Sequence, residues 1–179
     1  MLDCQKIFKR ICLTTLVLYL LTPNGNKIAV HGSSSGSPVQ ACADMVPAHH
    51  VDAQTSASPF VTKPSVTSAG NDSTITLTLA SASPGIAFKG FLIMGFNNAN
   101  HTEGPIGSFS SISNGQIIDC PGGSPKNAAT HSNSDNKTSV TVDWTAPAQF
   151  VGTVLFKTTY AENGGIFWVA TKSAPVTFV

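Results

Sequence analysis

The chain has 179 residues and a formal net charge of +1 at pH 7. This value hides an asymmetry, because four of the ten basic residues precede Gly32, and the rest of the chain carries six lysines, no arginine and eight carboxylates. A nucleic-acid-binding surface normally shows clustered Arg and Lys on one face. Composition therefore argues against a nucleic-acid partner.

The first element in chain order is a basic stretch followed by an apolar run. Lys6, Lys9 and Arg10 precede Ile11–Leu21, a run of eleven residues. This arrangement is typical of a secretory signal peptide, and the run is shorter than the roughly 20 residues that span a bilayer. The alternative is a buried helix or an uncleaved anchor. We expect a secreted, extracellular protein with no membrane span.

Turn residues and small polar residues set the expected boundaries that follow. We assign residues 1–32 to the signal peptide and its c-region, with cleavage between residues 25 and 37. Residues 33–41 include a Ser/Gly-rich stretch and are expected to be flexible. Residues 42–179 are long enough for one domain with a hydrophobic core.

Two cysteines, Cys42 and Cys120, remain after the predicted signal peptide, since Cys4 and Cys12 lie within it. In an oxidising compartment we expect these two to form a disulfide. The alternative is two separate buried thiols. Asn71, Asn100 and Asn136 each begin an N-x-S/T triplet and are candidates for N-glycosylation. A chain rich in Asn, Ser and Thr also produces such triplets by chance, but their positions indicate exposed loops.

The remainder of the chain has the pattern of short strands. Residues 72–80 alternate cleanly between apolar and Thr side chains, which predicts a strand with one buried face. Residues 88–96 are apolar on both faces, as in a central strand. An edge strand containing Pro64 is expected at 60–66. The other predicted strands are 116–120, 139–144, 152–161, 166–171 and 175–179.

Dense Gly, Pro and Asn residues separate these strands, and Asn163-Gly164-Gly165 predicts a hairpin loop. No convincing helical period follows Gly32. These features predict an all-β fold, an antiparallel immunoglobulin-like β-sandwich of about seven to nine strands with one disulfide. Two segments, 97–114 and 121–137, lack any pattern, and long irregular segments are often functional.

Residues with catalytic potential are few. The chain contains no G-x-S-x-G motif, and its carboxylates are scattered one to a segment. We therefore expect no enzyme, no catalytic residue and no cofactor. His49, His50, His101 and His131 could gather round a metal, but no pair has the spacing of a known site. A hydrogen-bonding role for His49 and His131 near the disulfide is the preferred interpretation, and we expect no metal.

The irregular segments supply the candidate ligand-binding residues, which are His101, Lys126, His131 and Lys137. Lysines in such loops could meet anionic polymers, although the net negative charge of the domain weakens a purely electrostatic mechanism. Trp144, Tyr160 and Trp168 could stack on sugars, but their alternation with apolar residues favours the core.

An ordered set of short motifs resembles the reeler domain, the module at the N-terminus of reelin and spondin-type matrix proteins. The set begins at Cys42-x-x-Met45-x-Pro47-x-His49 and extends over nearly the whole predicted domain. It continues through Gln54 with Pro59-Phe60, Phe88-Lys89-Gly90-Phe91-Leu92, Gly107-Ser108-Phe109, Cys120 with Thr130-His131-Ser132, Trp144-x-Ala146-Pro147, Gly152-x-Val154-x-Phe156 and Phe167-Trp168-Val169.

A secreted chain with a single reeler-like unit is similar to the insect defense proteins, including the noduler-like group. The resemblance implies an innate-immune haemolymph protein that binds microbial surface polymers and promotes aggregation, nodulation or an antibacterial response. The implied partners are polymers of the lipopolysaccharide, lipoteichoic acid and β-glucan class, together with a haemocyte surface. The alternative is a matrix or adhesion module that binds glycosaminoglycan or a protein.

Overall fold

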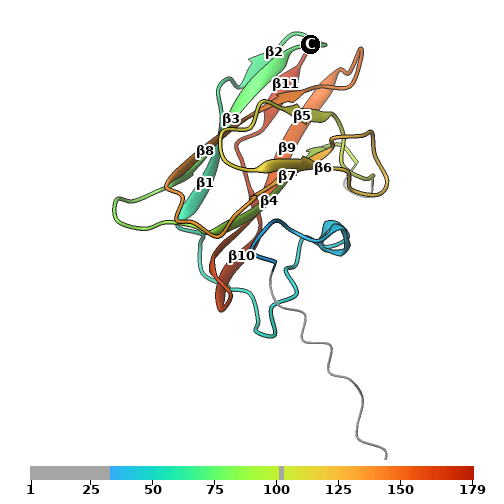
Figure 1. The fold of residues 1–179 in the computed structure, drawn as a ribbon. Coiled ribbons are helices and arrows are strands. Elements are labelled where there is room, and N and C mark those ends of the chain that lie inside the picture. The colour runs from blue at the N-terminus through green and yellow to red at the C-terminus, as the bar shows by residue number, and fades with distance from the viewer. Residues whose placement is uncertain (1–32, 101–102) are drawn as a thin grey trace, which may run out of the picture.

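The computed structural model describes residues 33–100 and 103–179, so the predicted signal peptide and His101 lie outside the described part. Within it, strands form two sheets that pack face to face (Figure 1). The four-stranded sheet has the order β1 (Phe60–Pro64), β3 (Thr74–Ser81), β8 (Ser139–Thr145) and β5 (Ser108–Ser110). The seven-stranded sheet has the order β2 (Ser68–Ala69), β11 (Val176–Phe178), β9 (Gly152–Asn163), β4 (Gly90–Asn97), β7 (Ala128–Thr130) and β6 (Gln116–Ile118), with β10 (Ile166–Lys172) also paired to β9.

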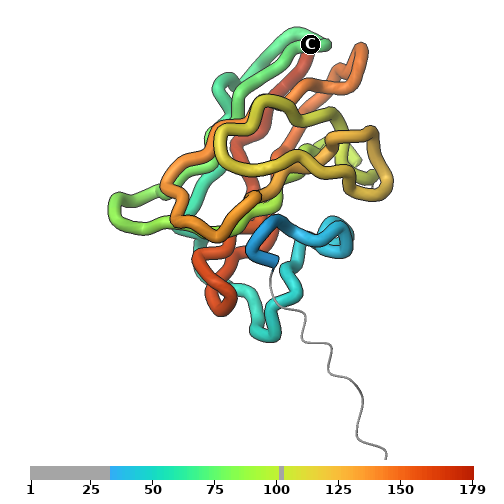
Figure 2. Tube along the Cα trace, in the orientation of Figure 1, coloured from blue at the N-terminus to red at the C-terminus, as the bar shows by residue number. Residues whose placement is uncertain are grey.

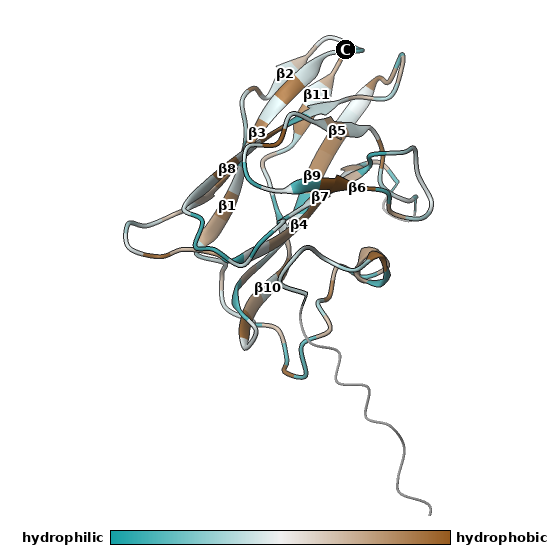
Figure 3. Cartoon of the chain, in the orientation of Figure 1, coloured by the Kyte–Doolittle hydropathy of each residue, from teal (hydrophilic) through white to brown (hydrophobic). Residues whose placement is uncertain are grey.

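The sandwich core follows from the alternation of the strands. Leu77 pairs with Val142 and Ile75 with Trp144 in antiparallel register, and all four side chains point toward the second sheet. Tyr160 and Phe156 of β9 meet them there, fully buried. The apolar stretches of β9 and β10 are visible in Figure 3. Trp144, Tyr160 and Trp168 are therefore core residues, as the alternation predicted.

Strand β4 is buried on both faces, as predicted for a central strand. Phe91 and Ile93 face the sandwich core, whereas Leu92, Met94 and Phe96 face outward into a second apolar cluster. Residues 33–49, called the N-terminal cap from here on, contribute Ala41 and Met45 to this second cluster. The cap contains one short 3-10 helix, Val39–Cys42, and lies against the outer face of the sheet (Figure 2).

Strand β9, the longest strand described, organises one edge of the larger sheet. Its first residues pair with β11 and its last residues pair with β10, so two successive strands share one edge of β9. Strand β10 contains a bulge between Trp168 and Thr171, where Ala170 has a φ of 50°. A bulge of this kind bends the strand and redirects its side chains. The outer edge of β10 is covered where the Gln54 N–H donates to the Phe167 carbonyl at 2.8 Å.

The predicted strands are all present, with ends shifted by one or two residues. The β1 strand does lie at a sheet edge with Pro64 as its last residue, and the hairpin at Asn163–Gly165 joins β9 to β10. Phe88, expected inside a strand, instead forms an isolated bridge with Lys137. Three strands were not predicted: β2, β5 and β7. Each has two or three residues, too few to show an alternating pattern.

Strands β5 and β7 lie inside the two segments that appeared to lack pattern, so those segments are partly ordered ladders rather than long loops. Among the described residues, no helix has both the length and the apolar character needed to cross a membrane.

Candidate functional site

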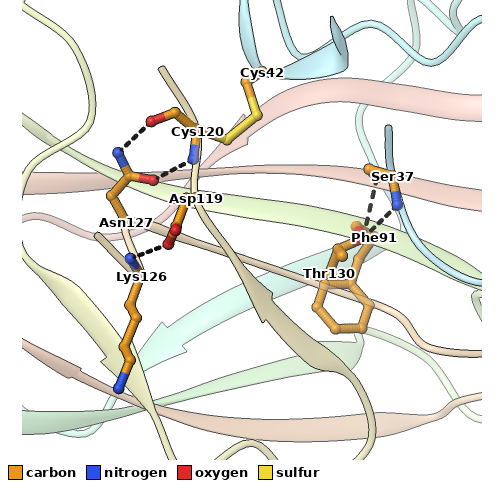
Figure 4. The surroundings of a disulfide bond; sticks show 8 residues. All are labelled: Ser37, Cys42, Phe91, Asp119, Cys120, Lys126, Asn127 and Thr130. Carbon is orange, nitrogen blue, oxygen red and sulfur yellow. Dashed lines mark hydrogen bonds between the residues drawn. A yellow bond between two sulfur atoms is a disulfide. The ribbon is translucent and has the colours of Figure 1, made fainter. Parts of the chain in front are cut away.

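The N-terminal cap is fixed to the sheet by the predicted disulfide, Cys42–Cys120, whose Cα atoms are 5.7 Å apart. Cys120 is itself held by the side chain of Asn127, which is fully buried. The Cys120 N–H donates to Asn127 Oδ1 at 2.7 Å, and Asn127 Nδ2 donates to the Cys120 carbonyl at 2.9 Å (Figure 4). The Asn127 side chain thus forms the same two hydrogen bonds that a residue on a neighbouring strand would form. These bonds fix the position of Cys120, whose disulfide holds the cap.

Thr130 and Thr159 tie the cap to the sheet by further hydrogen bonds. The Ser37 N–H donates to Thr130 Oγ1 at 3.0 Å, as Figure 4 shows. Thr159 Oγ1 donates to the Met45 carbonyl at 2.7 Å and accepts the Ala170 N–H at 3.1 Å. Met45 and Ala170 both have a positive φ, 62° and 50°, a conformation that costs free energy in non-glycine residues. Thr159 therefore joins the left-handed turn of the cap to the bulge of β10. The segment expected to be flexible makes defined contacts here.

His131 belongs to this docking interface and not to an exposed loop. Its exposed fraction is 8%. Nδ1 lies 3.2 Å from the Phe91 N–H, and Nε2 lies 3.0 Å from the Ser33 carbonyl. The Ser33 carbonyl can only accept, so Nε2–H donates to it, while Nδ1 also lies 3.2 Å from the Phe91 carbonyl and from Thr130 Oγ1, so both ring nitrogens are engaged. His131 therefore forms hydrogen bonds within the cap interface, and its buried position differs from the exposed loop expected of a ligand-binding residue.

Lys137 is also internal, which corrects its assignment to a ligand-binding loop. Only 2% of the residue is exposed. Its ammonium donates to the carbonyls of Lys89 (3.0 Å), Asn133 (2.9 Å) and Asp135 (2.8 Å), and to Asn133 Oδ1 (3.0 Å). Burial lowers the pKa of Lys137, and the neighbouring Asp135 carboxylate partly opposes that shift. The side chain therefore closes the 131–137 loop from inside and is not available to a polymer.

A cavity of about 280 Å³ separates the cap from the sheet. Its floor is the outer face of β4 and β9, with Gly90, Leu92, Thr159 and Ala161. The cap covers it through Pro38, Ala41, Met45, Pro47 and His49, and Lys89, His131 and Asn163 lie at its sides. No sequence motif indicated this cavity, because it forms between segments that are far apart in the chain.

His49 lines the cavity and packs edge-on against Phe167, with ring centroids 5.1 Å apart. Its Nδ1 is buried and has no hydrogen-bond partner among the described residues, so the hydrogen-bonding role predicted for His49 is not found at this atom. Burial lowers the pKa of His49, and the electrostatic interaction with His131 lowers that pKa further. A proton on His49 would therefore be bound more tightly in the unfolded chain than in the folded protein.

We predict that acid destabilises the protein through His49. Because the pKa of His49 is lower than 6.5 in the folded state, stability is lost as the pH falls below 6.5. His49→Phe keeps the ring contact with Phe167 and removes the titrating group, so its urea midpoint should fall less between about pH 7.5 and about pH 5.5. His50→Phe, at an exposed neighbour, is the matched control. Equal midpoint losses in wild type and His49→Phe would contradict the prediction.

A second candidate surface lies where the two irregular segments meet. A Cβ atom at Gly104 would overlap the carbonyl of Gly122, and one at Gly123 would overlap the carbonyl of Pro105. The Phe109 N–H donates to the Lys126 carbonyl at 2.7 Å. Glycine is thus required for this close approach. We call residues 98–100, 103–107 and 119–127 the paired loops.

The paired loops present a polar, accessible surface. Residues 121–126 are all exposed. Lys126 has a φ of 63°, and its N–H donates to Asp119 Oδ1 at 2.6 Å (Figure 4), so the loop is ordered by its own contacts. Of the four candidate ligand-binding residues, Lys126 alone is placed on this surface, since His101 lies outside the described residues.

The glycosylation candidates occupy different environments. Asn71 and Asn136 are exposed, as a glycan acceptor must be. Asn100 is half-buried, and its Nδ2 donates to Glu103 Oε1 at 2.7 Å. Within residues 33–100 and 103–179, no three His, Cys, Asp or Glu side chains come together in the manner of a metal site.

Fold and site together define a disulfide-stabilised β-sandwich module with an N-terminal cap. The family model described as "Reeler domain" matches residues 40–179, so this chain belongs to the reeler domain family. Human F-spondin's reeler domain has the same fold, with a TM-score of 0.62 and 19% identity, over 77% of this chain and 100% of that one.

Curated relatives include insect proteins named for defense. The chain is 30% identical to the "Putative defense protein" of Bombyx mori over 98% of this chain and 99% of the relative. It is 35% identical to "Putative defense protein 3" of Antheraea mylitta, over 80% and 85% of the two chains. It also shares 33% identity with the "Putative ferric-chelate reductase 1 homolog" of Drosophila melanogaster, but spans only 28% of that longer protein.

Proposed function

We propose that this chain is a secreted innate-immune protein that binds microbial surface polymers through the paired loops and promotes cell aggregation. The observation that carries the proposal is the joining of two irregular segments into one exposed surface at Gly104 and Gly122. Loops held on a rigid β-sandwich are a common place for binding sites. The names of the Bombyx and Antheraea relatives, which align over most of their lengths, support a defense role.

Export to the extracellular space is part of the proposal. It is supported by the basic and apolar run at the start of the chain and by the Cys42–Cys120 disulfide, which is stable in oxidising compartments. The exposed acceptors Asn71 and Asn136 are compatible with passage through the secretory pathway.

The proposed activity is binding without catalysis. Ferric-chelate reductase belongs to the name of a longer relative, of which this chain matches about a quarter. The paired loops offer Gly, Ser and Asn groups, one exposed lysine and the carboxylates of Glu103 and Asp119. Such a surface suits hydrogen bonding to the hydroxyl groups of a glycan more than electrostatic attraction, so binding should depend only weakly on salt.

The test blocks the paired loops without disturbing the fold. Ser124→Cys, at an exposed position, is coupled to polyethylene glycol maleimide, and Ser83→Cys carries the same adduct as the control. Residue 83 lies in the β3–β4 connection, on the opposite side of the molecule in Figure 1. Saturable binding to whole bacteria and yeast at physiological salt is measured for both.

We expect the Ser83 adduct to bind and agglutinate cells like wild type, and the Ser124 adduct to lose both activities. Equal binding by the two adducts would move the microbial site away from the paired loops. Retention on heparin beads without binding to cells would favour a matrix or adhesion module instead.

A further inference from the structure

The cavity beneath the N-terminal cap is built as a pocket with an apolar floor and roof. Leu92 comes from β4, and Ala41 and Met45 come from the cap, and all three belong to the second apolar cluster. Gly90 of β4 pairs with Ala161 of β9. Because neither has a large side chain, both leave space above the sheet for the pocket. A volume of about 280 Å³ is close to the lower limit of pockets that bind small organic ligands.

Charge is distributed unevenly around this pocket. Lys89 is the sole charged side chain among the residues that line it, and none of its lining residues is a carboxylate. Lys89 is exposed, so it marks the open side. The ring nitrogens of His131 are already engaged at Phe91 and Ser33, and burial lowers the pKa of His49, which leaves Lys89 as the cationic anchor of the pocket.

The apolar lining and the single lysine of the pocket favour one class of ligand. An apolar interior favours a hydrocarbon body because it removes apolar surface from water. A lone cation at the open side, with no carboxylate to neutralise it, favours a single anionic group there. The ligand class is therefore an amphiphile with one charged head and a linear apolar chain.

We propose that the pocket binds a fatty acid, with its carboxylate at Lys89 and its acyl chain between Leu92 and the cap residues Ala41 and Met45. This site is separate from the paired loops and does not depend on their role in microbial binding.

Three variants of the mature, disulfide-intact protein test the proposal by calorimetric titration with dodecanoate. Ala161→Leu places a larger side chain on the pocket floor and should weaken dodecanoate binding by at least about tenfold. Ala82→Leu makes the same change at an exposed position outside the pocket and should bind like wild type. Lys89→Met should weaken dodecanoate binding and leave binding of neutral dodecanol unchanged.

Other outcomes would overturn the proposal. They are a wild-type protein that does not bind dodecanoate, an Ala161→Leu variant that binds as tightly as wild type, or equal losses in Ala161→Leu and Ala82→Leu. Equal effects of Lys89→Met on dodecanoate and dodecanol would remove the lysine from the site and overturn the assignment of an anionic head group. Circular dichroism of each variant distinguishes a filled pocket from a misfolded chain.

Discussion

Replacing both Cys42 and Cys120 with alanine is expected to lower the free energy of unfolding by about 4 kcal/mol. The two cysteines lie 78 residues apart, so the disulfide removes a large amount of loop-closure entropy from the unfolded chain. Urea unfolding of the double variant measures the loss directly. The cap should also lose protection first, seen as faster hydrogen exchange at the Ser37 and Met45 amides, which are bonded to Thr130 and Ala41.

Asn127→Ala provides a comparison within the same region. It removes the two hydrogen bonds that hold Cys120 but leaves the disulfide able to form.

A loss below about 1 kcal/mol in the double cysteine variant, with unchanged hydrogen exchange in the cap, would contradict the prediction. It would show that apolar packing at Ala41 and Met45 is sufficient to hold the cap.

Replacing Lys137 with methionine is expected to cost about 3 kcal/mol. The two side chains have similar volume, so the apolar stem is retained while the ammonium is removed. The carbonyls of Lys89, Asn133 and Asp135 would then lose their donor inside the protein, and a buried acceptor without a partner is costly. Urea unfolding at neutral pH measures the change.

Lys63→Met is the matched control for this substitution. Lys63 is exposed on edge strand β1, so its replacement should change stability by no more than about 0.5 kcal/mol. If Lys137→Met were as stable as Lys63→Met, the hydrogen bonds of the ammonium would merely replace equivalent ones to water. The Phe88–Lys137 bridge should remain in either case, because it uses backbone groups only.

The strands that carry the sandwich could be predicted because their burial pattern is local. Residues 74–81 alternate between the core and the outer surface, and the alternation of Ile75, Leu77 and Leu79 is visible in the sequence. The double-sided burial of β4 was equally evident from its uninterrupted apolar side chains. The disulfide followed from counting cysteines, since two remained and the fold brings them together.

The cavity could not be predicted, because it depends on contacts between distant segments. Nothing in the local sequence of Thr159 indicates that its hydroxyl joins Met45 to Ala170. Lys137 was misassigned for a related reason. A lysine in a polar segment is usually solvated, and only the fold shows that the carbonyls of Lys89, Asn133 and Asp135 turn inward to enclose it.

The cap has a particular place in the order of biosynthesis. It is the first described segment to be synthesised, yet the sheet on which it rests is completed by β9 and β10, which are made last but for β11. The hydrogen bond between Met45 and Thr159 cannot form until more than 100 further residues have been added to the chain. Cys42 likewise cannot form its disulfide until Cys120 has been added, 78 residues later. The disulfide and the hydrogen bonds of the cap can therefore form only after most of the domain has been made, so the part of the domain that is synthesised first docks last.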